Sequence, residues 1–269
     1  MKELYIRSIT GALFAVFVLG AMFWSFWAFF GVIGVFTAVG LSEFIRLFTS
    51  GNNKGSIIYY FVGIVIYGLT ALTLTYKIDI STLLLIIPGM FLLLAAELYK
   101  KPNPDWQNIG GYFTGIFYVA VPFGMMNAFF FIKSGSTAVP WELLALFILV
   151  WTNDVFAYLT GSLIGKHKLF ESLSPKKTWE GTLGGVTFTV LFSWLFSLFT
   201  DSLTIWQWLI MGLIISVAAN FGDLGESLLK RNAGVKDSGK IFPGHGGVLD
   251  RFDAMIFATP FVYYYLFLI

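Results

Sequence analysis

Apolar runs long enough to cross a bilayer as helices constrain this chain more than any other feature of its sequence. A helix needs about 20 predominantly apolar residues to span the hydrocarbon core. Only 12% of the residues are charged, against about 25% in an average soluble domain. The sequence therefore predicts an all-α, multi-pass integral membrane helical bundle. Its nine expected spans lie near residues 8–26, 28–48, 56–76, 80–98, 109–132, 141–163, 180–200, 203–226 and 248–268.

The first two spans need separating, because residues 8–42 carry no charge and are too long for one helix. We place the break near Trp24–Trp27. With nine spans and a cytoplasmic N-terminus, 15 of the 17 Lys and Arg residues lie inside, and only Lys77 and Lys133 lie outside. Merging the first two spans would give 13 against 4. The positive-inside rule favours the first arrangement.

The chain is expected to form a single membrane domain over residues 1–269, in the inner (cytoplasmic) membrane. Its N-terminal helices cover residues 1–135, and residues 141–269 carry the longest cytoplasmic loops. The sequence has no cysteine. Disulfides, thiolate catalysis and cysteine-based zinc sites are therefore excluded.

Polar chemistry is concentrated between the last two spans, from Ser227 to Asp253. This stretch holds five cations, three carboxylates, one histidine and five glycines. Its glycines at 244, 246 and 247 allow two interpretations. They form a turn before the last helix, or they let backbone N–H groups approach a phosphate at the helix N-terminus. Their position between cations and carboxylates favours a phosphate site.

Two carboxylates in predicted spans, Glu43 and Glu97, have ordinary explanations. Each is close in sequence to cations, Arg46 in the first case and Lys100 with Lys101 in the second. Pairing of charges at helix ends is the favoured interpretation for both.

Four other carboxylates, Asp154, Asp223, Asp250 and Asp253, are candidates for function. Ionisable groups in spans usually face a polar cavity or a polar partner. Asp250 and Asp253 are three residues apart and share a helix face, where capping of the last helix is the alternative interpretation. Two aspartates directly after a Gly-rich turn favour a hard divalent cation such as Mg²⁺.

A second polar cluster, Ser174-Pro-Lys-Lys-Thr-Trp-Glu-Gly181, precedes the seventh span. Ser174 or Thr178 is suited to cap that helix. Lys176 and Lys177 either attract lipid headgroups, at about 1 kcal/mol each, or bind substrate phosphates. Upstream, Ala157, Gly161 and Gly165 form a small-residue face suited to close helix packing, which would point Asp154 into the bundle.

The run from Ser227 to Asp253 resembles the signature of the phosphatidate cytidylyltransferases (CDP-diacylglycerol synthases). The segments Ser174–Gly181 and Asn153-Asp154 are also similar to that family. Every fixed position of the signature is present, namely Ser227, Lys230, Arg231, Lys236, Asp237, Gly239, Phe242, Pro243, His245, Gly246, Gly247, Asp250, Arg251 and Asp253.

The resemblance implies that CTP and phosphatidate react to give CDP-diacylglycerol and pyrophosphate. It also implies Mg²⁺, leaving open a second cation such as K⁺, and a homodimer with a polar cavity open to the cytoplasm and to bilayer lipids. No nucleic acid partner is expected. Metal ligation falls on Asp223 and Asp250, followed by Asp253 and Asp154.

The residues themselves suggest how phosphate charge is neutralised. Lys230, Arg231, Lys236 and Arg251 would act on the triphosphate and the phosphatidate headgroup. The substrate-binding set is expected to comprise Lys176, Lys177, Ser227, Asp237, His245, Gly246 and Gly247.

Three other functions are compatible with an apolar chain of this kind. An ion-coupled transporter would spread polar residues over the whole membrane depth, whereas here they cluster on one side. A CDP-alcohol phosphotransferase would carry an Asp-Gly-x-x-Ala-Arg run, which the sequence lacks. A CTP-dependent prenol or lipid kinase differs only in its acceptor and stays open.

Overall fold

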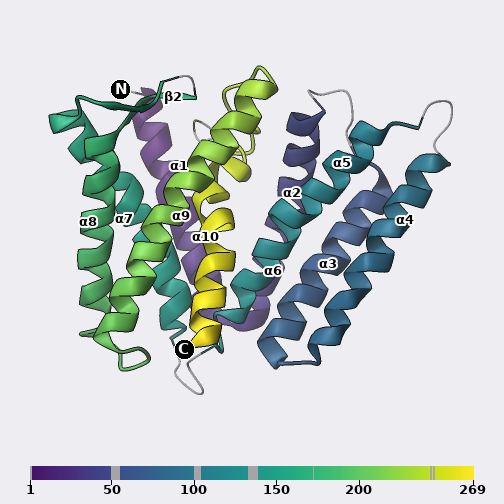
Figure 1. The fold of residues 1–269 in the computed structure, drawn as a ribbon, viewed down its shortest axis with the longest axis horizontal. Coiled ribbons are helices and arrows are strands. Elements are labelled where there is room, and N and C mark those ends of the chain that lie inside the picture. Colours follow the sequence, from purple (N-terminus) through teal and green to yellow (C-terminus); the bar gives the residue numbers. More distant parts are fainter. Residues whose placement is uncertain are drawn as a thin grey trace. The chain divides into compact units, whose positions relative to one another are not determined.

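The computed structural model describes residues 2–49, 55–99, 104–132, 139–171, 173–242, 244 and 246–269. Over these ranges the chain forms nine helical rods, one at each predicted span (Figure 1). This confirms the all-α fold class. The rods are α1 (Lys2–Trp24), α2 (Phe26–Phe48), α3 (Ile57–Tyr76), η1 (Ile80–Leu85) with α4 (Ile86–Leu98), α5 (Trp106–Gly115) with η2 (Ile116–Ala120) and α6 (Val121–Ala128), α7 (Trp141–Ile164), α8 (Trp179–Phe196), α9 (Ile205–Asn232) and α10 (Leu249–Leu268).

The membrane character of the helices agrees with the sequence. Six rods have the length and composition needed to cross a bilayer, namely Phe26–Phe48, Ile57–Tyr76, Ile80–Leu98, Trp106–Ala128, Trp141–Ile164 and Ile205–Asn232. A shorter apolar stretch covers Thr10–Trp24. The protein is therefore a multi-pass integral membrane protein.

The break between the first two helices lies at Ser25, inside the predicted interval Trp24–Trp27. Ser25 is extended, with φ of −170° and ψ of 161°. Its Oγ accepts a hydrogen bond from the backbone N–H of Ala28 at 3.1 Å. A side-chain acceptor at this position satisfies one of the free donors of a new helix, so α2 begins here.

The rod formed by α5, η2 and α6 contains one π turn, at Ile116–Ala120. Pro122 lies two residues after this turn, and proline has no N–H to donate to the carbonyl four residues earlier. Local π geometry is a common way for a helix to absorb such an interruption. The apolar run therefore continues as a single rod despite its proline.

The chain divides into two compact units. The first comprises Met1–Ala128 and Leu229–Phe252, and the second comprises Phe129–Leu228 and Asp253–Ile269. In the first unit α3 packs against α2, α4 and α6. In the second unit α7 and α8 form the main helix pair (Figure 1).

Small residues determine how closely α7 and α8 approach. A Cβ atom on Gly181 would lie 2.7 Å from the backbone oxygen of Ala157, and one on Gly185 would lie 3.0 Å from the backbone oxygen of Asn153. The expected small-residue packing face on α7 is thus confirmed at Ala157 and Gly161, which meet Gly181 of α8.

A short β-hairpin connects these two helices. Its strands β1 (Lys168–Phe170) and β2 (Ser174–Thr178) are antiparallel, with Lys168 opposite Thr178. Thr178 then caps α8, because its Oγ1 accepts the N–H of Gly181 at 3.1 Å. The hairpin brings the Lys-Lys pair of β2 next to the start of α8.

Candidate active site

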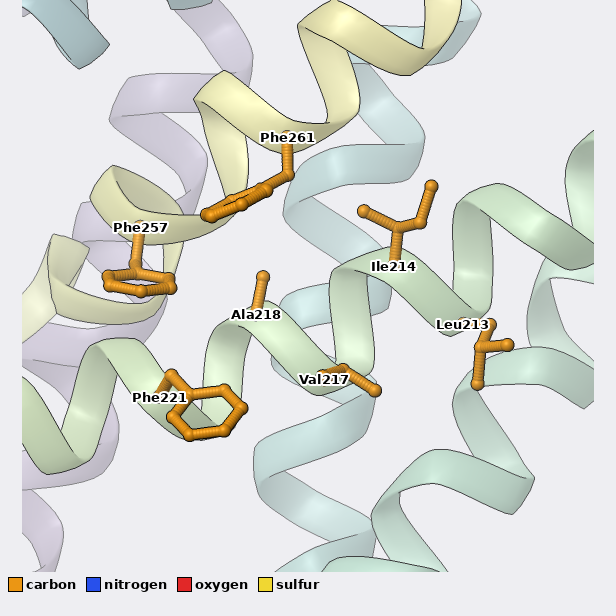
Figure 2. A pocket seen from close by; sticks show the side chains of 7 residues that line it. All are labelled: Leu213, Ile214, Val217, Ala218, Phe221, Phe257 and Phe261. Atoms are coloured by element: carbon orange, nitrogen blue, oxygen red, sulfur yellow. The ribbon is translucent and has the colours of Figure 1, made fainter.

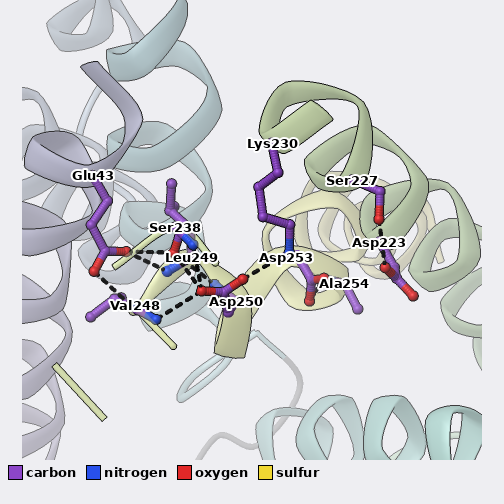
Figure 3. Close-up of polar contacts among 11 residues, drawn as sticks. Glu43, Asp223, Ser227, Lys230, Ser238, Val248, Leu249, Asp250, Asp253 and Ala254 are labelled. Carbon is purple, nitrogen blue, oxygen red and sulfur yellow. Dashed lines mark hydrogen bonds and ion pairs between the residues drawn. The ribbon is translucent and has the colours of Figure 1, made fainter. Parts of the chain in front are cut away.

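A buried ion pair lies at the base of the loop between α9 and α10, in the first unit. The Nζ of Lys230, near the end of α9, is 2.7 Å from Oδ1 of Asp250 in the first turn of α10. Oδ2 of Asp250 accepts hydrogen bonds from the backbone N–H and the hydroxyl of Ser238 at 2.7 and 2.8 Å, and from the N–H of Gly247 at 2.8 Å (Figure 3). Two residues predicted for separate roles are therefore direct partners.

Glu43 of α2 reaches the same loop, which corrects the sequence-based interpretation. Its carboxylate accepts hydrogen bonds from Ser238 Oγ at 3.0 Å, Val248 N at 3.1 Å and Leu249 N at 2.9 Å (Figure 3). The expected pairing with Arg46 is wrong, because that guanidinium instead donates to the carbonyl and hydroxyl of Ser42. Glu43 is 0% exposed.

The glycines of this loop leave room for the two carboxylates. A Cβ atom at Gly239 or Gly247 would overlap with the carboxylate of Glu43, and one at Gly246 would overlap with that of Asp250. Gly246 also has a φ of +79°, a conformation that glycine adopts without steric cost. These glycines therefore have a packing role, and their contact with a phosphate stays a prediction.

A polar pocket of about 520 Å³ opens in the second unit between α7, the hairpin, α8 and α9. It combines cations with carboxylates and uncharged polar groups. Its charged lining residues are Lys168, Lys176, Lys177, Asp154 and Asp223. Its other polar side chains belong to Asn153, Tyr158, Ser162, Thr178, Thr182 and Asn220.

Within this pocket Lys177 forms an ion pair with Asp223. Asp223 also lies 3.4 Å from the hydroxyl of Ser227, one turn later on α9. The side chains of Lys177 and Asp223 are 23% and 35% exposed. A pair that is open to solvent to this extent can exchange its partners for those of a ligand, since exposed ion pairs contribute only about 0–1 kcal/mol.

Asp253 lies close enough to three other carboxylates of the second unit for their negative charge to act on it. Asp253 of α10 interacts with Glu226 and Asp223 of α9 and with Asp154 of α7. Like charges at close range destabilise one another unless cations neutralise them. The lysines of the polar pocket and a bound cation are both suited to do so.

A second pocket of the same unit differs entirely in its chemistry. It has a volume of about 540 Å³ and lies between α9 and α10. Its lining consists of apolar side chains that converge from the two helices (Figure 2), namely Leu213, Ile214, Val217, Ala218, Phe221, Phe257 and Phe261. With no polar group to meet a phosphate, this pocket is excluded as the nucleotide site.

Comparison with known proteins identifies the relatives of this chain. The model of the cytidylyltransferase family matches residues 5–269. The chain belongs to this family. The match covers all but the first four residues of the chain, including every residue of the two sites.

Individual relatives of this chain are phosphatidate cytidylyltransferases of staphylococci. The protein of Staphylococcus epidermidis is 37% identical over 176 residues, which make up 65% of this chain and 65% of the relative. Those of Staphylococcus haemolyticus and Staphylococcus aureus are 38% identical over the same share of each chain. The aligned part thus spans slightly less than two thirds of the relatives.

The other residues predicted for the site differ in exposure. Arg231, Lys236 and Asp237 are exposed on or after the end of α9. Arg251 is half-buried, and its Nε has no hydrogen-bond partner within the described part of the chain. His245 lies outside the described residues.

The carboxylates of the second unit fit a metal ion in the type of their ligand atoms. Carboxylate oxygens are the ligands that Mg²⁺ prefers, and Asp154, Asp223 and Asp253 supply them in the second unit. However, no three His, Asp or Glu side chains converge as a metal-binding group among the described residues. Asp250 already uses both oxygens, on Lys230, Ser238 and Gly247. Metal ligation by these four aspartates stays a prediction.

Sequence reasoning missed several residues of the site. Lys168 and Asn153 line the polar pocket, and Glu43 and Ser238 hold the α9–α10 loop. Lys168 lies only eight residues before Lys176, so a predicted hairpin would have found it. For Glu43 no local signal exists, because its partners are 195 to 206 residues away.

Proposed function

We propose that this cytidylyltransferase transfers the cytidylyl group of CTP to phosphatidate, giving CDP-diacylglycerol and pyrophosphate. The observation that carries the proposal is the polar pocket, in which Lys168, Lys176 and Lys177 gather beside Asp154 and Asp223. A triphosphate needs several cations, and the acceptor phosphate adds further negative charge. Family membership and the name of the staphylococcal relatives agree with this chemistry.

The reaction needs little covalent help from the protein. An oxygen of the phosphatidate phosphate attacks the α-phosphorus of CTP, one P–O bond forms, and the bond to the β-phosphate breaks to release pyrophosphate. The attacking oxygen is already anionic, since the second pKa of a phosphate monoester is about 6. Positioning and charge neutralisation therefore dominate catalysis.

The lysines of the hairpin have the main role in this scheme. Lys177 would leave Asp223 and bind a phosphate oxygen, and Lys176 and Lys168 would neutralise the remaining charge. Asn153 adds an acceptor, because its buried Oδ1 has no hydrogen-bond partner in the part of the chain that is described. Such an acceptor suits an amino or hydroxyl group of the nucleoside.

We include Mg²⁺ in the proposal, with K⁺ as a possible second cation. A bound Mg²⁺ would supply Lewis-acid charge neutralisation for the triphosphate and the departing pyrophosphate. Asp154, Asp223 and Asp253 offer oxygen ligands of the correct kind. Asp250, which is paired with Lys230, remains a further metal ligand predicted from the sequence.

The proposal places the active site at the cytoplasmic face of the cytoplasmic (inner) membrane, in a homodimer. The charge asymmetry of the loops supports this orientation, and CTP is a cytoplasmic substrate. Both acyl chains of the acceptor could then remain among bilayer lipids while its headgroup reacts.

The direct test uses purified protein in lipid nanodiscs with CTP, phosphatidate and Mg²⁺. We expect CDP-diacylglycerol and pyrophosphate in equal amounts, measured by mass spectrometry and by a coupled pyrophosphate assay. Formation of CDP instead of pyrophosphate would indicate a lipid kinase and refute the proposal, as would the absence of any product.

Lysine variants test the pocket itself. Lys176→Ala and Lys177→Ala should each reduce kcat/KM by about 10- to 1,000-fold, the range for removal of one group that stabilises developing charge. Lys166→Ala is the matched control, since that lysine belongs to the same connection but does not line the pocket. Asp250→Asn is less informative, because breaking a buried pair costs about 3–5 kcal/mol of stability.

A further inference from the structure

We infer that Glu43 is a positioning residue for the α9–α10 loop, acting on the proposed phosphate chemistry from a helix in the first fifth of the chain. The inference rests on the proposed function and adds a residue that the signature motifs do not contain. Glu43 is fully buried, and over the described residues its carboxylate accepts hydrogen bonds from Ser238, Val248 and Leu249 of that loop and helix.

The backbone N–H groups at the start of α10 need hydrogen-bond acceptors from outside the helix. The first N–H groups of a helix have no partner within the helix, and the residue before Leu249 is Val248, which has no side-chain acceptor. The carboxylate of Glu43 accepts the N–H groups of Val248 and Leu249, at 3.1 and 2.9 Å. It thus caps α10 from α2, and its negative charge is favourable at this end of the helix dipole.

The same carboxylate also reaches Asp250 through one shared residue. Ser238 Oγ lies 3.0 Å from Glu43 Oε2 and 2.8 Å from Asp250 Oδ2. Asp250 in turn holds Lys230. Glu43 therefore fixes one end of a continuous chain of contacts from Ser238 to Asp250 and Lys230, all within the first unit (Figure 3).

The loop is shaped around this carboxylate. The overlap that a Cβ atom at Gly239 or Gly247 would make with Glu43 is an observation independent of the hydrogen bonds. Gly247 is a fixed glycine of the family signature and Gly239 occupies one of its small-residue positions, and the carboxylate of Glu43 gives a physical reason for small residues at both. The carboxylate of Glu43 therefore limits the size of the side chains that this loop can carry, although the loop follows about 200 residues later in the chain.

The test compares Glu43→Gln with Glu97→Gln. Glu97 is a matched control, because it is also a buried glutamate of the first unit, 2% exposed, and bonds Asn108 Nδ2 at 2.7 Å, away from the loop. Glutamine keeps the shape of glutamate, but its amide nitrogen is only a donor, so at least one of the N–H groups of Val248 and Leu249 loses its acceptor. We expect Glu43→Gln to lower kcat/KM about 10- to 100-fold, as is usual for residues that orient functional groups, and Glu97→Gln to change it less than about threefold.

Two further measurements separate positioning from stability. Hydrogen exchange of peptides covering residues 236–250 should accelerate in Glu43→Gln but not in Glu97→Gln, and this readout does not need the proposed activity. Glu43→Gln combined with Ser238→Ala should lose little more activity than the worse single variant, because the two side chains share one hydrogen bond.

The outcomes separate the two proposals. If the wild type makes no CDP-diacylglycerol, the proposed function fails, while the exchange result still decides the role of Glu43. If Glu43→Gln exchanges and reacts like the wild type, or if Glu97→Gln loses as much activity, the inference is overturned. If Glu43→Gln does not fold, Glu43→Asp, which keeps the charge one methylene shorter, should give intermediate activity, and wild-type activity there would also overturn the inference.

Discussion

Single charged residues around the α9–α10 loop differ in whether their charge is already matched by the protein. Lys230 is paired with Asp250 inside the first unit. Arg251, the next residue on α10, has a buried Nε without a hydrogen-bond partner in the described ranges. A buried donor of this kind usually has a partner, and a phosphate oxygen would supply one. Arg251, the single cation of α10, is therefore well suited to meet a substrate.

We predict that Arg251→Lys lowers kcat/KM for CTP by about 10- to 100-fold, the cost of roughly 1.5–3 kcal/mol for a hydrogen bond to a charged group. Lysine retains the charge but not the planar fork that binds phosphate in a bidentate manner. Steady-state kinetics at saturating phosphatidate measures the effect. Arg46→Lys, at an exposed position of α2 outside the predicted site, provides the comparison, and equal losses in both variants would argue against a specific role for Arg251.

A glycine pair tests the packing of the loop. Gly247→Ala should destabilise the protein and abolish most activity, because the new methyl group would displace the carboxylate of Glu43 or the hydroxyl of Ser238. Gly225→Ala, in α9, meets no atom within 4 Å and should be neutral or stabilising by about 0.5–1 kcal/mol. Thermal unfolding in detergent measures both, and a tolerated Gly247→Ala would contradict the observed packing.

At the scale of elements, the β-hairpin between α7 and α8 is held to the start of α8 by one side chain. Glu180 accepts the backbone N–H groups of Lys166 and His167 at 3.1 and 3.2 Å, and its other oxygen is 2.6 Å from His167 Nδ1. The N–H of Trp179 donates to the carbonyl of His167 at 2.9 Å. These bonds position the strand that carries Lys176 and Lys177.

We predict that Glu180→Ala raises KM for CTP about 10-fold or more, with a smaller change in kcat, because the lysines of the hairpin lose their fixed position before substrate binds. Hydrogen exchange in residues 166–178 should increase in parallel. Glu171→Ala, at the exposed turn of the same hairpin, should leave both quantities unchanged. An unchanged KM in Glu180→Ala would show that the hairpin keeps its conformation without this contact.

The positions of the helices were the features that the sequence predicted best. Apolar length located the nine rods, and the absence of any charge between Arg7 and Glu43 required a break that the structure places at Ser25. The hairpin was not foreseen, because Lys168–Phe170 is only three residues long and its pairing depends on the packing of α7 with α8. Short strands of this kind have too little periodicity to be recognised.

At the scale of the whole molecule, contacts between residues that are far apart in the chain could not be predicted from the sequence. Glu43 was assigned to Arg46, its neighbour by helical spacing, yet its partners follow about 200 residues later. Lys230 with Asp250 and Lys177 with Asp223 were predicted as site residues but not as pairs. Residue type and spacing indicate what a side chain can bind, whereas the tertiary fold decides which partner is within reach.

The orientation of the whole chain in the membrane can be measured by labelling single introduced cysteines, because the chain contains no cysteine of its own. We predict that Glu171→Cys, in the hairpin, is modified by a membrane-impermeant thiol reagent only when the cytoplasmic side is accessible. Asp201→Cys, exposed between α8 and α9, should be modified from the opposite side. The positive-inside distribution is the physical reason, and labelling of both positions from one side would refute the nine-span orientation.

The overlap between Glu43 and the loop glycines has an evolutionary consequence. A Cβ atom at position 239 or 247 would overlap with the carboxylate of Glu43, so a larger residue at either position requires that carboxylate to move away from the loop. A shorter side chain at position 43 would remove this conflict. Among related chains, position 43 should therefore vary together with two positions about 200 residues away, although α2 shares no motif with the loop.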